Sequence, residues 1–137
     1  MIGKIVLSIL IAFIVAQTLK LIFNRLQKGK WEYSTLVQDG GMPSSHTSVV
    51  VALTISILLE TGLSYYFAIC VILALIVMND AMKVRRETGE EAEVLNELIQ
   101  KENIFHTRLI TKVGHTPLQV AMGLINGTLI TLIVYAF

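Results

Sequence analysis

The sequence predicts an all-α integral membrane protein, a helical bundle with four transmembrane helices and one further amphipathic helix. The first observation is composition: 54% of the 137 residues are hydrophobic, only 15% are charged, and the mean hydropathy is +0.69. A soluble domain of this length needs a polar surface that so few charged side chains cannot supply. The second observation is that the apolar residues form long runs, as membrane-spanning helices require.

Four apolar runs define the expected spans within a single membrane domain, residues 1–137. They cover about residues 2–23, 43–60, 64–80 and 117–137. The first run has no small-residue cleavage pattern, so we interpret it as a retained span and not as a signal peptide. The second and third are joined by the tight turn 60–62. Pro43 and Pro117 open the second and fourth, and proline suits the first turn of a helix.

The basic residues predict the orientation. Four spans place segments 24–46 and 80–116 on one side of the membrane, and both termini on the other. Ten of the 11 basic residues fall on the first side: Lys20, Arg25, Lys28, Lys30, Lys83, Arg85, Arg86, Lys101, Arg108 and Lys112. By the positive-inside rule, we expect that side to be the cytoplasmic face of the plasma membrane.

The hydrophilic segment 80–116 is expected to contain a cytoplasmic amphipathic helix over about residues 88–103. Thr88 and Glu91 have capping-box spacing. The apolar residues Val94, Leu95 and Leu98 then recur on one face. This helix is expected to pack on the ends of the spans or to lie in the interface, with its glutamates on a solvated face and not around Mg²⁺.

The stretch from Gly40 to Thr47 has the outline of an anion site. Glycines precede a proline, two hydroxyl side chains (Ser44 and Ser45) and His46, all at the start of a membrane helix. The unpaired N–H groups of a first helical turn attract phosphate, and the serine hydroxyls are further donors. The alternative is that one serine only caps the helix and His46 lies in the headgroup layer.

A second stretch, Gly114-His115-Thr116-Pro117, repeats this layout at the same membrane face. One histidine can act as a nucleophile while another protonates a leaving oxygen near neutral pH. Two histidines, two helix starts and many basic residues indicate a phosphate ester as the ligand. The chain has no zinc pattern of cysteines and histidines, so we expect no metal and no cofactor, and we expect no nucleic-acid partner.

These motifs resemble those of the type 2 phosphatidic acid phosphatase and vanadium-dependent haloperoxidase superfamily. Residues 43–46 resemble its Pro-Ser-Gly-His motif, with serine in place of glycine. Residues 115–123 resemble its His-x-Pro-x-Asp-Val-x-x-Gly motif, and Gly127 extends the match. The whole chain is similar to the small, divergent bacterial membrane branch of that superfamily.

The resemblance implies roles for particular residues. His115 would attack phosphorus to form a phosphohistidine, and His46 would protonate the departing alkoxide. Gln119 occupies the place of the aspartate that orients the nucleophile, so a carboxylate introduced there is expected to raise turnover. The superfamily's basic residues match loosely in spacing. The candidate substrate-binding residues are Ser44, Ser45, Lys20, Arg25, Arg85, Arg86, Arg108 and Gly114, although Arg85 and Arg86 could equally set topology or contact headgroups.

The expected function is therefore hydrolysis of a phosphate ester on a lipid or polyprenyl carrier, without a metal, by a protein embedded in the lipid bilayer. The main alternative is a non-catalytic protein that binds phospholipid or phosphate, because Gln119 lacks the charge of a carboxylate. Haloperoxidase chemistry is a weaker third reading. Catalytic cores of the superfamily usually have six helices, so four spans suggest a homodimer that completes the bundle.

Overall fold

The computed structural model describes residues 2–29, 31, 41–111 and 113–137, and these residues form helices and loops but no strand. The all-α prediction is therefore confirmed for the described part of the chain. Lys30, Gly40 and Lys112, which the sequence analysis singled out, lie outside it. The helices are α1 (Ile2–Lys28), α2 (Ser45–Thr61), α3 (Tyr65–Asn79), the π-helix η2 (Asp80–Val84), α4 (Arg85–Lys101) and α5 (Pro117–Ala136).

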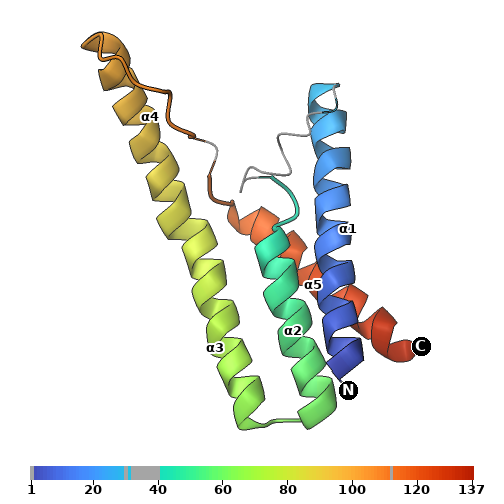
Figure 1. Cartoon of the computed structure of the whole chain (residues 1–137). Coiled ribbons are helices and arrows are strands. Elements are labelled where there is room, and N and C mark those ends of the chain that lie inside the picture. The colour runs from blue at the N-terminus through green and yellow to red at the C-terminus, as the bar shows by residue number, and fades with distance from the viewer. Residues whose placement is uncertain (1, 30, 32–40, 112) are drawn as a thin grey trace.

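The helix α2 lies at the centre and contacts α1, α3 and α5 (Figure 1). Its buried positions hold small side chains: Ser45, Thr47, Ser48, Val50, Val51, Ala52, Thr54 and Ser56. In a membrane, lipid tails are as apolar as the helices, so close van der Waals packing and hydrogen bonds between helices hold the bundle together. The side chain of Asn126 in α5 makes one such bond, donating to the Ala12 carbonyl of α1 at 3.0 Å.

Two glycines set the crossing of α5 over α2. A Cβ atom at Gly123 would lie 2.6 Å from the carbonyl oxygen of Ser44, and one at Gly127 would lie 2.5 Å from that of Ser48. Such distances leave no room for any side chain, so only glycine allows the two backbones to come this close. The crossing fixes the start of α2 against the start of α5.

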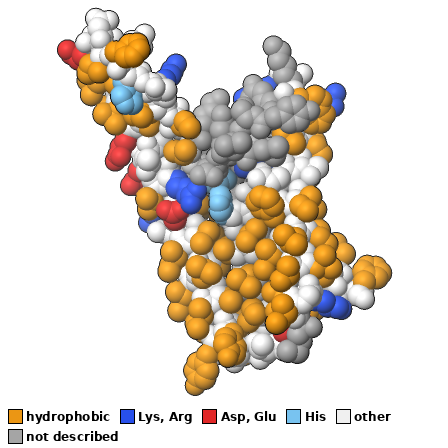
Figure 2. Space-filling view, in the orientation of Figure 1, with side chains coloured by type: hydrophobic (Ala, Val, Ile, Leu, Met, Phe, Trp, Pro, Cys, Tyr) orange, Lys and Arg blue, Asp and Glu red, His pale blue; other side chains and the backbone are white. Residues whose placement is uncertain are grey.

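On the face that Figure 2 shows, an apolar belt covers the lower part of the molecule, and charged side chains gather mainly above it. Exposed Leu, Ile, Phe and Val side chains of α1, α3 and α5 form the belt, and α3 buries only Ala74. Within the part of the chain that the structure describes, three helices are long and apolar enough to cross a membrane: α1, the helix Tyr65–Lys101 and α5. The 17-residue α2 is shorter, at roughly 25 Å. The chain is thus a multi-pass membrane protein, and a count of four spans stays a prediction.

The ends of the helices divide between two sides. The N-terminus of α1, the turn between α2 and α3, and the C-terminus lie at one end of the bundle, and the starts of α2 and α5 lie at the other (Figure 1). This arrangement agrees with the grouping of segments expected from the four runs. Which compartment each side faces stays a prediction.

The amphipathic helix does not begin where the sequence suggested. Residues Tyr65–Lys101 form one continuous helix of 37 residues, so α4 extends α3 through η2. The Thr88 hydroxyl donates to the Val84 carbonyl one turn earlier and does not cap a new helix. Segment 80–88 contains neither proline nor glycine, so nothing interrupts α3 at the end of its apolar run.

Candidate functional site

Ser44 is the N-cap of α2. Its Oγ accepts a hydrogen bond from the Thr47 backbone N–H at 3.4 Å and another from the Thr47 hydroxyl at 3.0 Å. The capping interpretation of a serine is therefore correct for Ser44, and Pro43 precedes the cap instead of standing in the first turn. Ser45 is the first helical residue and is buried. Helix geometry leaves the N–H groups of Ser45 and His46 without an intrahelical acceptor.

The start of α5 is closed by a reciprocal capping box. The Gln119 backbone N–H donates to the Thr116 hydroxyl at 3.4 Å, and the Thr116 N–H donates to the Gln119 side-chain oxygen at 3.0 Å. Pro117 occupies the first turn, as the sequence predicted. Because the cap uses the Gln119 oxygen, the side chain turns its NH₂ group away from Thr116. An orienting contact from Gln119 to a histidine stays a prediction.

The two helix starts are bonded to each other. The Ser44 N–H donates to the Gln119 carbonyl at 3.0 Å, and the Ser48 hydroxyl donates to the Gly123 carbonyl at 3.1 Å. Two partial positive charges, each about half an elementary charge, therefore meet at one place. Such a meeting of helix N-termini is suited to a phosphate group.

His115 is held between the start of α5 and η2. Its backbone N–H donates to the Ala81 carbonyl at 2.9 Å, and its side chain is only 2% exposed. Gly114, at φ +85°, lies so close to α4 that a Cβ atom on it would lie 2.6 Å from the backbone nitrogen of Arg86. The sequence therefore needs glycine at 114 to bring His115 under α4. His46, in the first turn of α2, is exposed, so the two histidines come from adjoining helix starts but differ in burial.

A small cavity of about 80 Å³ lies beside this junction. It is lined by Lys20, Phe23, Asn24, Gln27, Gly41, Met42 and Gln119. Lys20 is only 3% exposed, and Gly41 approaches it closely enough that a Cβ atom would lie 3.1 Å from the Lys20 Cγ. The structure thus brings Lys20 and Gln119 to one cavity, and a role of either in binding phosphate stays a prediction. Asn24 and Gln27 were not among the predicted site residues, although their spacing from Lys20 places all three on one helix face.

Three of the predicted basic residues have partners within the chain. Arg85 Nε pairs with the Asp80 carboxylate at 2.7 Å, and Arg86 Nε pairs with the Glu90 carboxylate at 3.2 Å. The Arg25 guanidinium stacks over the Trp31 ring, 4.4 Å from its centroid. A phosphate bound by any of the three would share the arginine with this partner.

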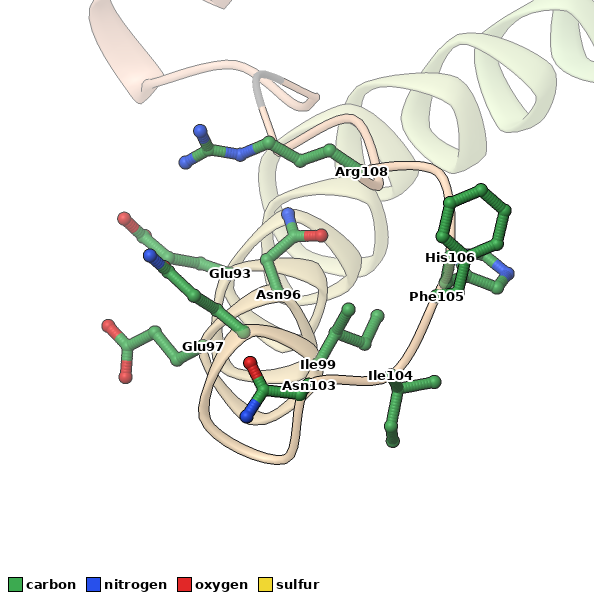
Figure 3. A pocket seen from close by; sticks show the side chains of 10 residues that line it. Glu93, Asn96, Glu97, Ile99, Asn103, Ile104, Phe105, His106 and Arg108 are labelled. Carbon is green, nitrogen blue, oxygen red and sulfur yellow. The ribbon is translucent and has the colours of Figure 1, made fainter.

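Arg108 lines a different hollow, of about 510 Å³, beside the last turns of α4. Figure 3 shows Arg108 and His106 on the returning loop and Glu93 and Glu97 on α4 around it. The Asn96 side chain holds this loop through two hydrogen bonds with the Leu109 backbone, at 2.8 and 2.9 Å. The structure therefore does not bring Arg108 into the cavity that holds Lys20. Among the described residues, no three His, Cys, Asp or Glu side chains are grouped as a metal site.

The comparison with protein families identifies the chain. The model of the family described as "Divergent PAP2 family" matches residues 2–130, which is nearly the whole chain. The chain belongs to the divergent PAP2 family. The resemblance carried by the two histidine motifs is thereby confirmed, and membership supports a phosphatase-like membrane protein.

A relative within the curated proteins agrees with this assignment. The protein named "Uncharacterized membrane protein YuiD" of Bacillus subtilis (strain 168) is 37% identical over 147 residues, which cover 96% of this chain and 93% of the relative. Comparison with solved structures finds no match. Family membership and this relative both support a multi-pass membrane protein.

Proposed function

We propose that the protein is a membrane-embedded phosphatase that hydrolyses a lipid-linked phosphate ester through a phosphohistidine intermediate, without a metal. The observation that carries this proposal is the bond between Ser44 and Gln119, which gathers two helix N-termini beside a buried lysine and a buried histidine. Membership of a PAP2-like family supports phosphoester chemistry at this place.

In the proposed reaction, a ring nitrogen of His115 attacks phosphorus and the P–O bond to the lipid alcohol breaks. His46 gives its proton to the departing alkoxide, so the alcohol leaves neutral. A water molecule then attacks the phosphohistidine, with His46 now accepting a proton, and inorganic phosphate leaves with His115 restored. The N–H groups of Ser45 and His46, together with Lys20, would stabilise the charge on the phosphoryl oxygens.

The level of the site supports a lipid substrate. The starts of α2 and α5 lie at the upper end of the bundle, and Figure 2 shows a histidine at the upper edge of the apolar belt. A phosphate bound at this edge allows an attached hydrocarbon chain to stay in the bilayer. We place the site on the cytoplasmic face of the plasma membrane, because the basic residues concentrate on that side.

A second candidate function is phosphate or phospholipid binding without turnover. The capping box favours it, because the Gln119 oxygen already accepts from the Thr116 N–H and an amide carries no negative charge. A homodimer fits either function, since α3 leaves the apolar face with Ile69 and Ile72 exposed for a second copy. Mass measurement in nanodiscs tests the dimer, and a monomer alone would contradict it.

Phosphate release from a panel of lipid and polyprenyl phosphates tests the main proposal. Purified protein in nanodiscs should release phosphate from at least one member, and His115→Ala should release none. Binding without release by the unmodified protein would instead favour the second candidate. Release that survives His115→Ala undiminished would contradict the phosphohistidine mechanism.

A further inference from the structure

A second hollow lies lower in the bundle, between α2, α3 and α5. It has a volume of about 210 Å³ and is lined by Val51, Thr54, Ile55, Val71, Ala74, Leu75, Met78, Leu124 and Thr128. We call it the α3–α5 groove. Leu75 is 59% exposed and Leu124 is 44% exposed, so the groove opens sideways at the apolar surface of the bundle.

The lining of the α3–α5 groove is suited to hydrocarbon. Seven of the nine lining side chains are aliphatic or Met, and apolar atoms form nearly all of the groove's surface. The Thr54 hydroxyl lies 2.7 Å from the Val50 carbonyl and 3.3 Å from the Cys70 carbonyl, so its hydrogen is already used within the helices. A polar ligand would lose its hydration there without gaining partners, whereas an apolar chain loses nothing.

The groove lies below His115, on the side of α2 that faces α3. Val51 follows Ser45 by six residues in α2, which is about 9 Å along a helix axis. At its upper end, Met78 comes three residues before Ala81, whose carbonyl accepts the His115 N–H. One lining residue thus lies within a turn of the residue that holds His115, and the others continue into the apolar belt.

We propose that the α3–α5 groove binds the hydrocarbon chain of the phosphate ester whose headgroup occupies the site above it. This inference rests on the proposed function, and it identifies the substrate as an amphiphile with its phosphate at the chain end. The polarity of the two sites agrees, because the donors at the starts of α2 and α5 lie above and the apolar α3–α5 groove lies below. A helix with its side chains is about 10 Å across and is too wide to enter this volume, whereas a segment of a single hydrocarbon chain is narrow enough.

The first test uses tryptophan in matched pairs. Leu75→Trp and Leu124→Trp place a large ring at the groove, while Ile76→Trp and Ile125→Trp place the same ring on the neighbouring residues, which are half-exposed or more and do not line it. KM is measured for dioleoyl phosphatidic acid and for glycerol 3-phosphate. The groove variants should raise KM for the long-chain ester by about tenfold or more and leave that of glycerol 3-phosphate within about twofold. Equal effects on both esters, or equal effects of the groove and control variants, would overturn the inference.

The second test detects binding and does not need turnover. Phosphatidic acid with a diazirine near the middle of its chain is incorporated into phosphatidylcholine nanodiscs, beside a diacylglycerol that carries the same chain. The phosphate lipid should label peptides containing Leu75 and Leu124 more strongly than the diacylglycerol does, and Leu124→Trp should reduce that labelling. Equal labelling by both lipids would show bulk lipid in the groove and overturn the inference.

The two tests separate failure of the groove from failure of the proposed function. Preferential labelling with no phosphate release from any ester would support the hydrocarbon-chain site and contradict the proposed phosphatase activity. Phosphate release would support the phosphatase activity. If the groove variants then raised KM equally for both esters and the phosphate lipid gave no preferential labelling, the hydrocarbon-chain site would be contradicted. Disulfide dimers formed through Leu75→Cys in a protein without Cys70, in place of lipid labelling, would show that a second copy covers the groove and would also overturn it.

Discussion

The backbone N–H of Ser44 donates a hydrogen bond to the carbonyl oxygen of Gln119 across 3.0 Å, and this bond joins the first turns of α2 and α5. The bond forms only because Gly123, one turn further along α5, lets the Ser44 carbonyl approach its backbone. The geometry of the anion site therefore depends on packing between helices as much as on the polar residues that line it.

Gly123→Ala should destabilise the protein and weaken phosphate binding together. The added Cβ would lie 2.6 Å from the Ser44 oxygen, and forcing a methyl group into a packed contact costs about 1–3 kcal/mol. Thermal unfolding in detergent and phosphate-release kinetics measure the two effects. Gly3→Ala is the matched control, because it lies in α1 with no atom within 4 Å of an added Cβ. Equal melting temperatures for the two variants would contradict the role of the close crossing.

Lys20→Met should raise KM for a phosphate ester and change kcat much less. Lys20 is buried beside the α5 start, and a hydrogen bond to a charged group contributes about 1.5–3 kcal/mol, or roughly ten- to hundredfold in affinity. Lys101→Met, at the far end of α4, is the control and should change neither constant. An unchanged KM in Lys20→Met would show that Lys20 does not bind the substrate phosphate.

Much of this arrangement could be predicted from the sequence, because it follows from local patterns. Apolar run length located the helices, and proline after glycine and histidine located the start of α5. The continuity of α3 and α4 could not be predicted, because Thr88 and Glu91 have the spacing of a cap. Whether a threonine caps a helix or lies inside one depends on the backbone before it, and here that backbone stays helical through η2.

The hydrogen bonds of the Gln119 side chain could not be predicted from the sequence either. Its position relative to His115 suggested an orienting residue, but its position relative to Thr116 makes a capping box, and both spacings are present in the same chain. The structure shows the cap formed. Asn24 and Gln27 could not be predicted as site residues, because polar residues near the end of a membrane helix are ordinary. Only the approach of Gly41 and Gln119 makes their face of α1 part of a cavity.

Gln119→Glu should keep the fold and raise KM. Glutamate preserves the capping box with Thr116 and adds a negative charge at a helix N-terminus, so the melting temperature should be unchanged or higher. The same charge faces the cavity of Lys20, where the substrate phosphate is proposed to bind. Its repulsion of that phosphate, by about 1 kcal/mol, would raise KM by about fivefold. Steady-state kinetics beside Gln119→Met, which removes the cap without adding charge, separate the two effects. A kcat increased by about tenfold would show instead that the carboxylate supports His115, as the sequence suggested.

Labelling of single cysteines tests the orientation. With Cys70 replaced, a cysteine at Glu97 in α4 should resist an impermeant thiol reagent in intact cells, because α4 is expected in the cytoplasm. A cysteine at Leu63, in the turn between α2 and α3 at the opposite end of the bundle, should react readily. Both should react once the cells are opened. The reverse pattern in intact cells would invert the proposed topology.

His46→Ala should impair esters in proportion to the basicity of their leaving group. A general acid contributes about 10²–10⁴-fold when the departing oxygen is strongly basic, so hydrolysis of an alkyl phosphate should fall by at least about 10²-fold. An aryl phosphate with an acidic phenol needs no proton to depart, so release of its phenol in the first turnover should change far less. His106→Ala is the matched control, because His106 lies by the α4 hollow, away from the helix starts.

The acid-labile phosphoenzyme distinguishes the two histidines. His115→Ala should abolish both reactions and the phosphoenzyme. His46→Ala should let the phosphoenzyme accumulate from the aryl ester, because His46 also activates the water that removes it. Equal losses of first-turnover release from the two esters in His46→Ala would assign His46 to phosphate binding and leave the leaving group without its proposed acid.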